Sequence, residues 1–319
     1  MITNYLKLPT GLILKLLCNN NFKMKYLLIV VTSFFLMPGA FSQTNPIIKI
    51  GLVADPQYAD KPTAGKRYYK ESLTKLAEAI DTFNFHKVDF IQNLGDIIDS
   101  DWESYNSILP VYDKLNPGIK NHQLLGNHDF SIDSTHLNDL LEKLSMPHYF
   151  YSYSEKGWRF IVLDATDYSY FSNVLHNHDS SQVDFYYNNT KDKSNKQSWN
   201  GAIGPEQQNW LKQELESAKL MNQKVILFSH LPIQPEKNAH NLWNDYEIVR
   251  ILETCRNVVA FINGHNHSGA YTHQNGIHYI TLTGMVDTKN NSYGMLEIYR
   301  DSLILKGYGN QKTLHLDMK

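Results

Sequence analysis

The sequence predicts an α/β fold in which two mixed sheets face each other and helices cover their outer sides. From residue 47 to residue 262, apolar runs typical of buried strands alternate with segments whose apolar residues recur at helical spacing. From residue 270 onward strand-like runs follow one another, and Asn275-Gly276 supplies a hairpin turn between two of them. An alternating half followed by antiparallel strands indicates two sheets packed together.

The same patterns place each element along the chain. Strands are expected at residues 47–54, 88–94, 122–125, 158–163, 225–228, 258–262, 270–273, 277–282, 293–299 and 303–306. Helices are expected at residues 69–80, 102–112, 205–218 and 246–254. Residues 168–198 are rich in Tyr, Asn, Ser and Asp and show little periodicity. We expect a surface insertion there, with a loop beside the active site as the alternative, because long loops in compact domains are often functional.

Composition is that of a folded globular protein. The 319 residues are 42% hydrophobic and 19% charged, and the formal net charge is -2. A surface that binds nucleic acid normally carries a basic excess, so no nucleic-acid partner is expected. Residues 44–319 are expected to form one domain after a leader at residues 1–43, and no pattern indicates an oligomeric state.

The leader has the pattern of a secretory signal peptide. Lys23-Met24-Lys25 precedes an apolar stretch at residues 26–37, and a small-residue cleavage site follows at residues 40–43. Translation from Met24 and cleavage at this site would give a periplasmic or secreted protein without a stable membrane span. A lipoprotein anchor at Cys18 is not expected, because a lysine interrupts the apolar run before it.

Five short polar clusters each follow a predicted strand. They are Asp55-Pro56-Gln57, Gly95-Asp96, Gly126-Asn127-His128-Asp129, Ser229-His230 and Gly264-His265-Asn266-His267. Loops at strand ends are where an α/β sheet presents side chains to a ligand. Each cluster alone also fits an ordinary turn, and Gly-His-Asn-His is the most specific, because two histidines two residues apart suit metal binding. All five in this order are hard to explain by packing.

Together the clusters supply the ligands of a dinuclear metal centre that cuts phosphate bonds. Phosphate hydrolysis needs a nucleophile from water and neutralised phosphoryl oxygens, and two divalent ions about 3.5–4 Å apart provide both. Two such ions need a shared carboxylate, and Asp96 is the expected bridge. The expected ligands of one ion are Asp55, Gln57 and His267, and those of the other are Asn127, His230 and His265.

His128 directly follows one expected ligand. We interpret it as a general acid or phosphate-polarising group that assists the leaving oxygen, with an orienting role behind the ligands as the alternative. His128 and the bridging Asp96 are thus the expected catalytic residues. Asp99 could hydrogen-bond His128 or cap the helix at residues 102–112, and capping is the preferred interpretation.

The order of these clusters resembles the calcineurin-like metallophosphoesterase superfamily, whose fold is a four-layer αββα sandwich. Most members have histidine where this chain has Gln57, and glutamine there is similar to the manganese-dependent ADP-ribose/CDP-alcohol diphosphatase family. Further stretches that match that family are residues 54–60, 67–69, 95–99, 163–167 and 201–207. The resemblance covers nearly all of the chain after the leader, with residues 168–198 as the main departure.

The resemblance implies a hydrolase that cuts a small nucleoside-diphosphate-linked substrate, such as ADP-ribose or a CDP-alcohol, between its two phosphates. Such a substrate needs a cation for its second phosphate and a flat face for its base. Arg67 is the expected cation, and Tyr58 and Tyr68 are the expected aromatic contacts; for each, the alternative is an ordinary surface or core role. The amide oxygen of Gln57 is a harder ligand than imidazole, so Mn²⁺ is the expected metal, with Mg²⁺, Fe²⁺ and Zn²⁺ as alternatives.

Other functions are open at this point. A phosphomonoesterase or a cyclic-nucleotide phosphodiesterase would use the same metal centre. A nucleotide-binding protein without catalysis is disfavoured, because every expected metal ligand is present. A structural metal site is also disfavoured, because such sites are usually closed shells of four ligands that often include Cys.

Overall fold

Apolar alternation along the chain builds two six-stranded sheets. The computed structural model describes residues 45–173 and 175–318, so the expected leader lies outside it. The strands of the first sheet are β1 (Ile48–Val53), β2 (Phe90–Asn93), β3 (Lys120–His122), β10 (Ser292–Ile298), β11 (Ser302–Gly309) and β12 (Leu314–Asp317). Those of the second sheet are β4 (Tyr151–Glu155), β5 (Trp158–Val162), β6 (Lys224–Phe228), β7 (Val258–Asn263), β8 (Ser268–Gln274) and β9 (Ile277–Thr283).

Both sheets are mixed, as predicted. The first has the strand order β12-β11-β10-β1-β2-β3 and the second the order β4-β5-β6-β7-β9-β8. In the first sheet β1 runs parallel to β2 and antiparallel to β10. In the second sheet β6 and β7 are parallel, whereas β8 and β9 form the predicted hairpin, in which Asn275 and Gly276 have φ angles of 50° and 81°.

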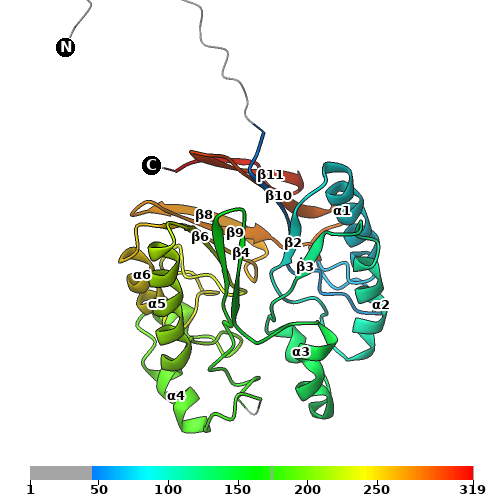
Figure 1. Ribbon diagram of the computed structural model, residues 1–319. Helices are drawn as coiled ribbons and strands as arrows, with labels where there is room; N and C mark the ends of the chain where they lie inside the picture. Colours follow the sequence, from blue (N-terminus) through cyan, green and yellow to red (C-terminus); the bar gives the residue numbers. More distant parts are fainter. Residues whose placement is uncertain (1–44, 174, 319) are drawn as a thin grey trace, which may run out of the picture. The chain divides into compact units, whose positions relative to one another are not determined.

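Helices cover the outer face of each sheet. They are α1 (Ser72–His86), α2 (Glu103–Tyr112), α3 (Leu140–Lys143), α4 (Ser180–Asn188), α5 (Pro205–Leu220) and α6 (Asp245–Glu253), with short 3-10 helices at His128–Phe130, Ser134–Asp139 and Lys193–Asn195. Figure 1 shows α1 and α2 on one side of the two sheets and α5 and α6 on the other. The predicted four-layer αββα sandwich is therefore confirmed. In the described residues, no helix is long and apolar enough to cross a membrane.

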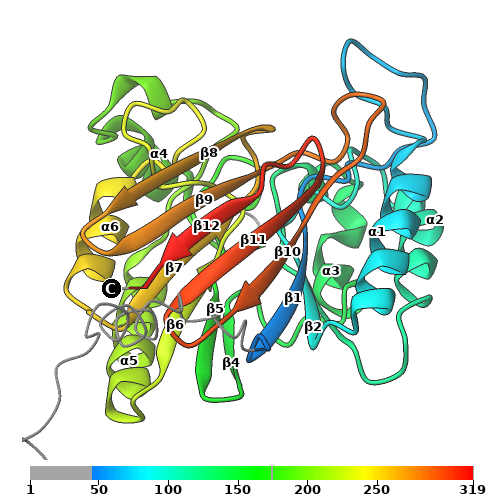
Figure 2. The ribbon, with the colours of Figure 1, turned by 90° about the horizontal axis from the view of Figure 1, so that it is seen from above.

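The alternation of side chains along β1 shows how the layers pack. Ile48, Ile50 and Leu52 belong to the core between the two sheets, which also contains Phe160 of β5. On the opposite face of β1, a Cβ on Gly51 would lie 2.7 Å from the ring of Phe83 in α1. The absence of a side chain at this position therefore lets the helix approach the sheet closely. Figure 2, turned by 90°, shows the strands of the sheets crossing the molecule between the flanking helices.

Three parts of the fold differ from the sequence-based prediction. The strand expected at residues 122–125 lies earlier, at Lys120–His122, because the following residues form the connection to the Gly126-Asn127 loop. Residues 168–198 are not irregular throughout, since they contain α4. A capping box between Asp179 and Gln182 starts this helix, and only Val183 is fully buried, so its apolar period is too weak to detect. The short elements β4, β12 and α3 were also not predicted.

Candidate metal centre

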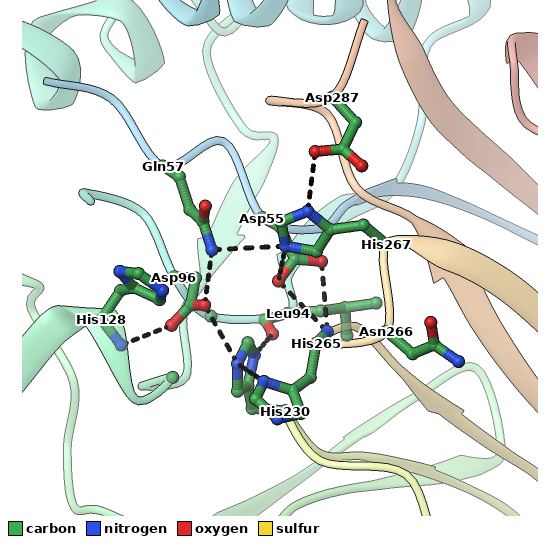
Figure 3. Close-up of polar contacts among 12 residues, drawn as sticks. Asp55, Gln57, Leu94, Asp96, His128, His230, His265, Asn266, His267 and Asp287 are labelled. Atoms are coloured by element: carbon green, nitrogen blue, oxygen red, sulfur yellow. Dashed lines mark hydrogen bonds and ion pairs between the residues drawn. The ribbon is translucent and has the colours of Figure 1, made fainter. Parts of the chain in front are cut away.

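The strand-end clusters meet where the two sheets adjoin. Asp55 follows β1 and Asp96 lies just beyond β2 of the first sheet, whereas His230 follows β6 and His265 follows β7 of the second. Figure 3 shows these side chains pointing toward one another. Parallel strands present their carboxyl ends at the same edge, so clusters distant in sequence converge there.

The backbone at this edge is strained. Asp55, Gln57, Asp96 and His265 have φ angles of 51°, 41°, 52° and 65°, in the left-handed region that residues with a Cβ rarely adopt. Each such residue costs about 1–3 kcal/mol, and residues of this kind cluster at functional sites. The left-handed backbone conformation directs these side chains toward one another (Figure 3).

Buried Asp129 holds together the loops that carry Asp96 and Gly126. Its carboxylate accepts hydrogen bonds from the backbone N–H groups of Asp96 (2.9 Å), Ile97 (3.0 Å) and Gly126 (2.8 Å), and from the Tyr105 hydroxyl (2.9 Å). Asp129 is fully buried. It belongs to the Gly126-Asn127-His128-Asp129 cluster, but it was not among the expected site residues. Its hydrogen bonds hold the Asp96 loop against the Gly126 loop.

All seven expected metal ligands lie in one contact network. Asp96 Oδ2 lies 2.9 Å from Gln57 Nε2 and 3.3 Å from His230 Nε2. His230 Nε2 in turn lies 3.3 Å from Asn127 Oδ1 and 3.2 Å from His265 Nδ1. His267 Nε2 lies 3.3 Å from Gln57 Nε2 and 3.6 Å from Asp55 Oδ1. In addition, Asp96, His230 and His265 each offer one ligand atom within 4.8 Å of the others, which is suited to a metal ion.

Outer hydrogen bonds orient the ring of each histidine. His230 Nδ1 donates to the carbonyl oxygen of Leu94 at 2.7 Å, which leaves Nε2 facing the cluster. His267 Nδ1 bonds Asp287 Oδ1 at 2.9 Å and likewise presents Nε2. His265 is reversed, because its Nε2 bonds Asn200 Oδ1 at 3.0 Å and its Nδ1 faces the cluster. Metal-binding histidines usually have their second nitrogen held in this way.

Asp287 and Asn200 are functional residues that sequence reasoning missed. Asp287 also forms an ion pair with Lys66 at 2.6 Å, so the loop that carries Lys66 is tied to His267. Neither residue belongs to a polar cluster at a strand end. For Asn200 the signal available was its place directly before the matching stretch at residues 201–207.

The donor set fits divalent cations. Gln57 Oε1 is buried without a hydrogen-bond partner, while Gln57 Nε2 is directed at His267 Nε2. Turning the amide by 180° would place its oxygen among acceptor atoms of Asp96 and His267, an arrangement that a cation would satisfy. Burial lowers the pKa of His230, but Asp96 outweighs burial and raises it to about 9. The cluster therefore attracts positive charge.

His128 stands at the edge of this cluster. Its backbone N–H donates to Asp96 Oδ1 at 2.8 Å, and its Nδ1 lies 2.9 Å from the carbonyl oxygen and 3.5 Å from a carboxylate oxygen of Asp99. Asp99 does not cap α2, so the preferred interpretation of this residue was wrong: α2 begins after Trp102 without a side-chain cap. Asp99 instead holds His128 and pairs with Lys61 and Arg67.

A cavity of about 360 Å³ opens over the cluster. Its wall is formed by Gln57, Arg67, Asp96, Asn127, His128, Trp199, His240, His265 and His267. Arg67, the expected cation, is therefore part of the cavity wall. Tyr58 and Tyr68 are not in this wall: Tyr58 is 6% exposed in the core beside α1 and α2, and the Tyr68 ring lies 5.6 Å from Lys75 Nζ. The wall instead contains Trp199, which is 45% exposed, and His240, a histidine that is not among the expected ligands.

Comparison with known proteins identifies the family. Residues 48–269 match the model of the calcineurin-like phosphoesterases, and this range includes all five strand-end clusters. The chain belongs to the calcineurin-like phosphoesterase family. The metallophosphoesterase is accordingly a hydrolase, and the resemblance drawn from the sequence motifs is confirmed.

The relatives of this metallophosphoesterase are similar over most of their length. A manganese-dependent ADP-ribose/CDP-alcohol diphosphatase from Oryza sativa subsp. japonica is 30% identical, with 83% of this chain and 92% of the relative covered. One of the same name from Xenopus laevis is 29% identical, with 85% and 91% covered. A dimetal phosphatase from Danio rerio is similar in structure, with a TM-score of 0.75, 25% identity, and 86% of this chain and 100% of that chain covered.

Proposed function

We propose that this metallophosphoesterase hydrolyses the pyrophosphate bond of nucleoside-diphosphate-linked substrates such as ADP-ribose or CDP-alcohols, with two Mn²⁺ ions in the described centre. The observation that carries this proposal is the composition of the cavity wall. Beside the expected metal ligands, the wall contains the guanidinium of Arg67 and the exposed indole of Trp199. Arg67 can bind a phosphate, and Trp199 can stack on a nucleobase. The relatives named as ADP-ribose/CDP-alcohol diphosphatases support the same substrate class.

The proposed ligands would hold two ions, and Asp96 would be a ligand of both. Asp55, Gln57 and His267 would hold one ion, and Asn127, His230 and His265 the other. When bound, two divalent ions supply an activated water and neutralise the phosphoryl oxygens. The oxygen of Gln57 makes the first site rich in hard ligands, which favours Mn²⁺ over softer ions.

The other residues would bind the substrate and move a proton. His128 Nδ1 is occupied by Asp99, so Nε2 is the ring nitrogen free to protonate the leaving phosphate oxygen. Arg67 would hold the phosphate that leaves, because its guanidinium lies in the cavity wall and its Nη1 is 3.6 Å from Asp99 Oδ1, a contact loose enough to exchange for an anion. His240 and Trp199 would enclose the nucleoside.

A hydrolysis panel tests this function. ADP-ribose, CDP-choline, a cyclic nucleotide and a phosphomonoester are each incubated with Mn²⁺, Mg²⁺ or Zn²⁺, and products are separated by chromatography. We expect two monophosphates from ADP-ribose and from CDP-choline, fastest with Mn²⁺. Turnover of the phosphomonoester or the cyclic nucleotide alone would contradict the proposal and assign the enzyme to one of those classes.

We also propose that the enzyme is exported and that its leader is removed near Ser42. The basic, apolar and small-residue segments of the sequence at residues 23–43 support this. Mass spectrometry of protein from the native host should give a mature N-terminus close to Gln43. An intact Met1 or Met24 on the mature species would contradict export.

A further inference from the structure

We propose that Asn200 is a positioning residue that fixes His265 in the tautomer needed for metal binding and thereby couples the metal centre to the segment that precedes it. This inference rests on the proposed function, because His265 is a proposed ligand. Asn200 does not line the cavity. It would act on the reaction only through His265.

The hydrogen bonds of Asn200 leave its amide one orientation. Asn200 is fully buried, and its Nδ2 donates to the carbonyl oxygens of Asn195 at 2.9 Å and Ala239 at 2.8 Å. If the amide were reversed, its oxygen would face two other oxygens and both bonds would be lost. Asn200 Oδ1 must therefore face His265 Nε2, at 3.0 Å.

This orientation sets the proton on His265. Asn200 Oδ1 can only accept, so the hydrogen of the neutral imidazole must lie on Nε2. Among the described residues, Asn200 is the only hydrogen-bond partner of this nitrogen. The lone pair then lies on Nδ1, which is 3.2 Å from His230 Nε2 and directed at the cluster. The opposite tautomer would direct a hydrogen at the site that a metal must occupy.

The chain around Asn200 is anchored independently of the cluster. The backbone N–H of Trp243 donates to the Gly201 carbonyl at 2.8 Å, and its indole N–H donates to the Gln197 carbonyl at 3.0 Å. Residues 197–201 are thus held against the loop after β6, and Asn200 projects from them to His265. The poorly periodic segment is thus linked to the metal centre through Asn200, which bonds the Asn195 carbonyl, although residues 168–198 contribute no side chain to the cavity wall.

Three variants separate positioning from simple structural support. Asn200→Ala removes the acceptor and both donors. Asn200→Asp keeps an acceptor for His265 but loses both donors. Asn244→Ala is the matched control, because Asn244 is buried and bonded only to nearby groups outside the cluster, including the Ile203 carbonyl at 2.9 Å. All three variants are expected to lose stability, so stability alone does not distinguish the roles.

The first readout is the His265 tautomer in metal-free protein, measured from the imidazole ¹⁵N shifts. The His265 signals are identified among the 14 histidines by their loss in His265→Ala. We expect the Nε2–H form in the wild type, in Asn200→Asp and in Asn244→Ala. Asn200→Ala should lose this preference. A wild-type tautomer in Asn200→Ala would overturn the inference.

The second readout is Mn²⁺ affinity, measured by calorimetry. Asn200→Ala should bind one Mn²⁺ about 10–100-fold more weakly, as is usual when the group behind a metal-binding histidine is removed. Asn200→Asp should stay within a few-fold of the wild type, and so should the Asn244→Ala control. Equal weakening in Asn200→Ala and Asn200→Asp would show a structural role only and overturn the inference. If the wild type bound no Mn²⁺, the proposed function would fail, and the tautomer comparison would still decide the role of Asn200.

Discussion

Asp96 and His230 come from different sheets, and His230 Nε2 lies 3.3 Å from Asp96 Oδ2. Asp96 is just beyond the end of β2, whereas His230 is just beyond the end of β6. Their contact can form only when the two sheets pack face to face. The metal centre is therefore a product of the tertiary fold, and the strength of this contact depends on the core between the sheets.

Replacing Asp96 should abolish hydrolysis. Asp96→Ala removes the one carboxylate expected to contact both ions, so two cations would face each other with less compensating charge. We expect no measurable turnover and loss of at least one bound Mn²⁺, determined by elemental analysis of dialysed protein. Asp81→Ala is the control, because Asp81 is exposed on α1. Full Mn²⁺ content in Asp96→Ala would show that Asp96 is not a bridge.

Replacing His128 should slow turnover without removing the metals. His128→Ala is expected to lower kcat by about 10²–10⁴-fold, the usual contribution of a general acid. The loss should be much smaller for a p-nitrophenyl phosphodiester, because nitrophenolate leaves without protonation. Equal losses for both substrates would exclude general-acid catalysis and favour an orienting role.

Gln57 should set the metal preference. Gln57→His exchanges an amide oxygen for a softer nitrogen and should raise activity with Zn²⁺ relative to Mn²⁺. The measurement is the Mn²⁺-to-Zn²⁺ ratio of kcat/KM in the wild type and the variant. If the ratio does not fall, ligand hardness at this position does not select the metal.

Trp199 should contribute to binding of the base. Stacking of a base on an aromatic side chain is worth about 1–3 kcal/mol, so Trp199→Ala should raise KM for ADP-ribose about 5–150-fold. Trp199→Phe should retain most of the affinity, and a p-nitrophenyl phosphodiester should be nearly unaffected. Tyr170→Ala is the matched control, since Tyr170 is 40% exposed and not part of the cavity wall. An unchanged KM for ADP-ribose in Trp199→Ala would place the base elsewhere.

His176 should stabilise the fold more strongly at low pH. Its Nε2 lies 3.1 Å from Asp164 Oδ2, and both side chains are largely buried. Burial lowers the pKa of His176, but the Asp164 carboxylate outweighs burial and raises it above its usual value. Because the folded-state pKa is raised, the stabilisation is complete below the unfolded value near 6.5 and is lost as pH rises through the folded value.

Urea unfolding at pH 5.5 and pH 8.5 tests this dependence. His176→Gln should lower the free energy of unfolding more at pH 5.5 than at pH 8.5. In the wild type, burial raises the pKa of Asp164, but neighbouring His176 outweighs burial and holds this pKa below its usual value. In an Asp164→Asn background the difference between the two pH values should disappear. Equal losses at both pH values would contradict the prediction.

Local sequence was sufficient for the sheets and for the proposed metal ligands. Period-two apolar alternation and helical spacing arise from backbone geometry within a few residues, so most strands and the helices α1, α2, α5 and α6 could be predicted. The clusters stood out because five groups rich in Asp, Asn and His each follow a predicted strand. Helix α4 could not be predicted in this way, because its apolar pattern is weak. A capping box and the packing of Tyr186 and Tyr187 stabilise this helix in place of an apolar stripe.

Only the tertiary structure could reveal the residues behind the ligands and around the cavity. Asn200 and His265 are 65 positions apart, and Asp287 and His267 are 20 apart, so no local period relates them. Trp199 and His240 enter the cavity wall from separate loops, whereas the tyrosines near Gln57 pack elsewhere. Residue type and spacing thus determined which side chains could bind metal in this chain. The packing of one sheet against the other decided how those side chains are oriented, because that orientation depends on contacts between segments far apart in sequence.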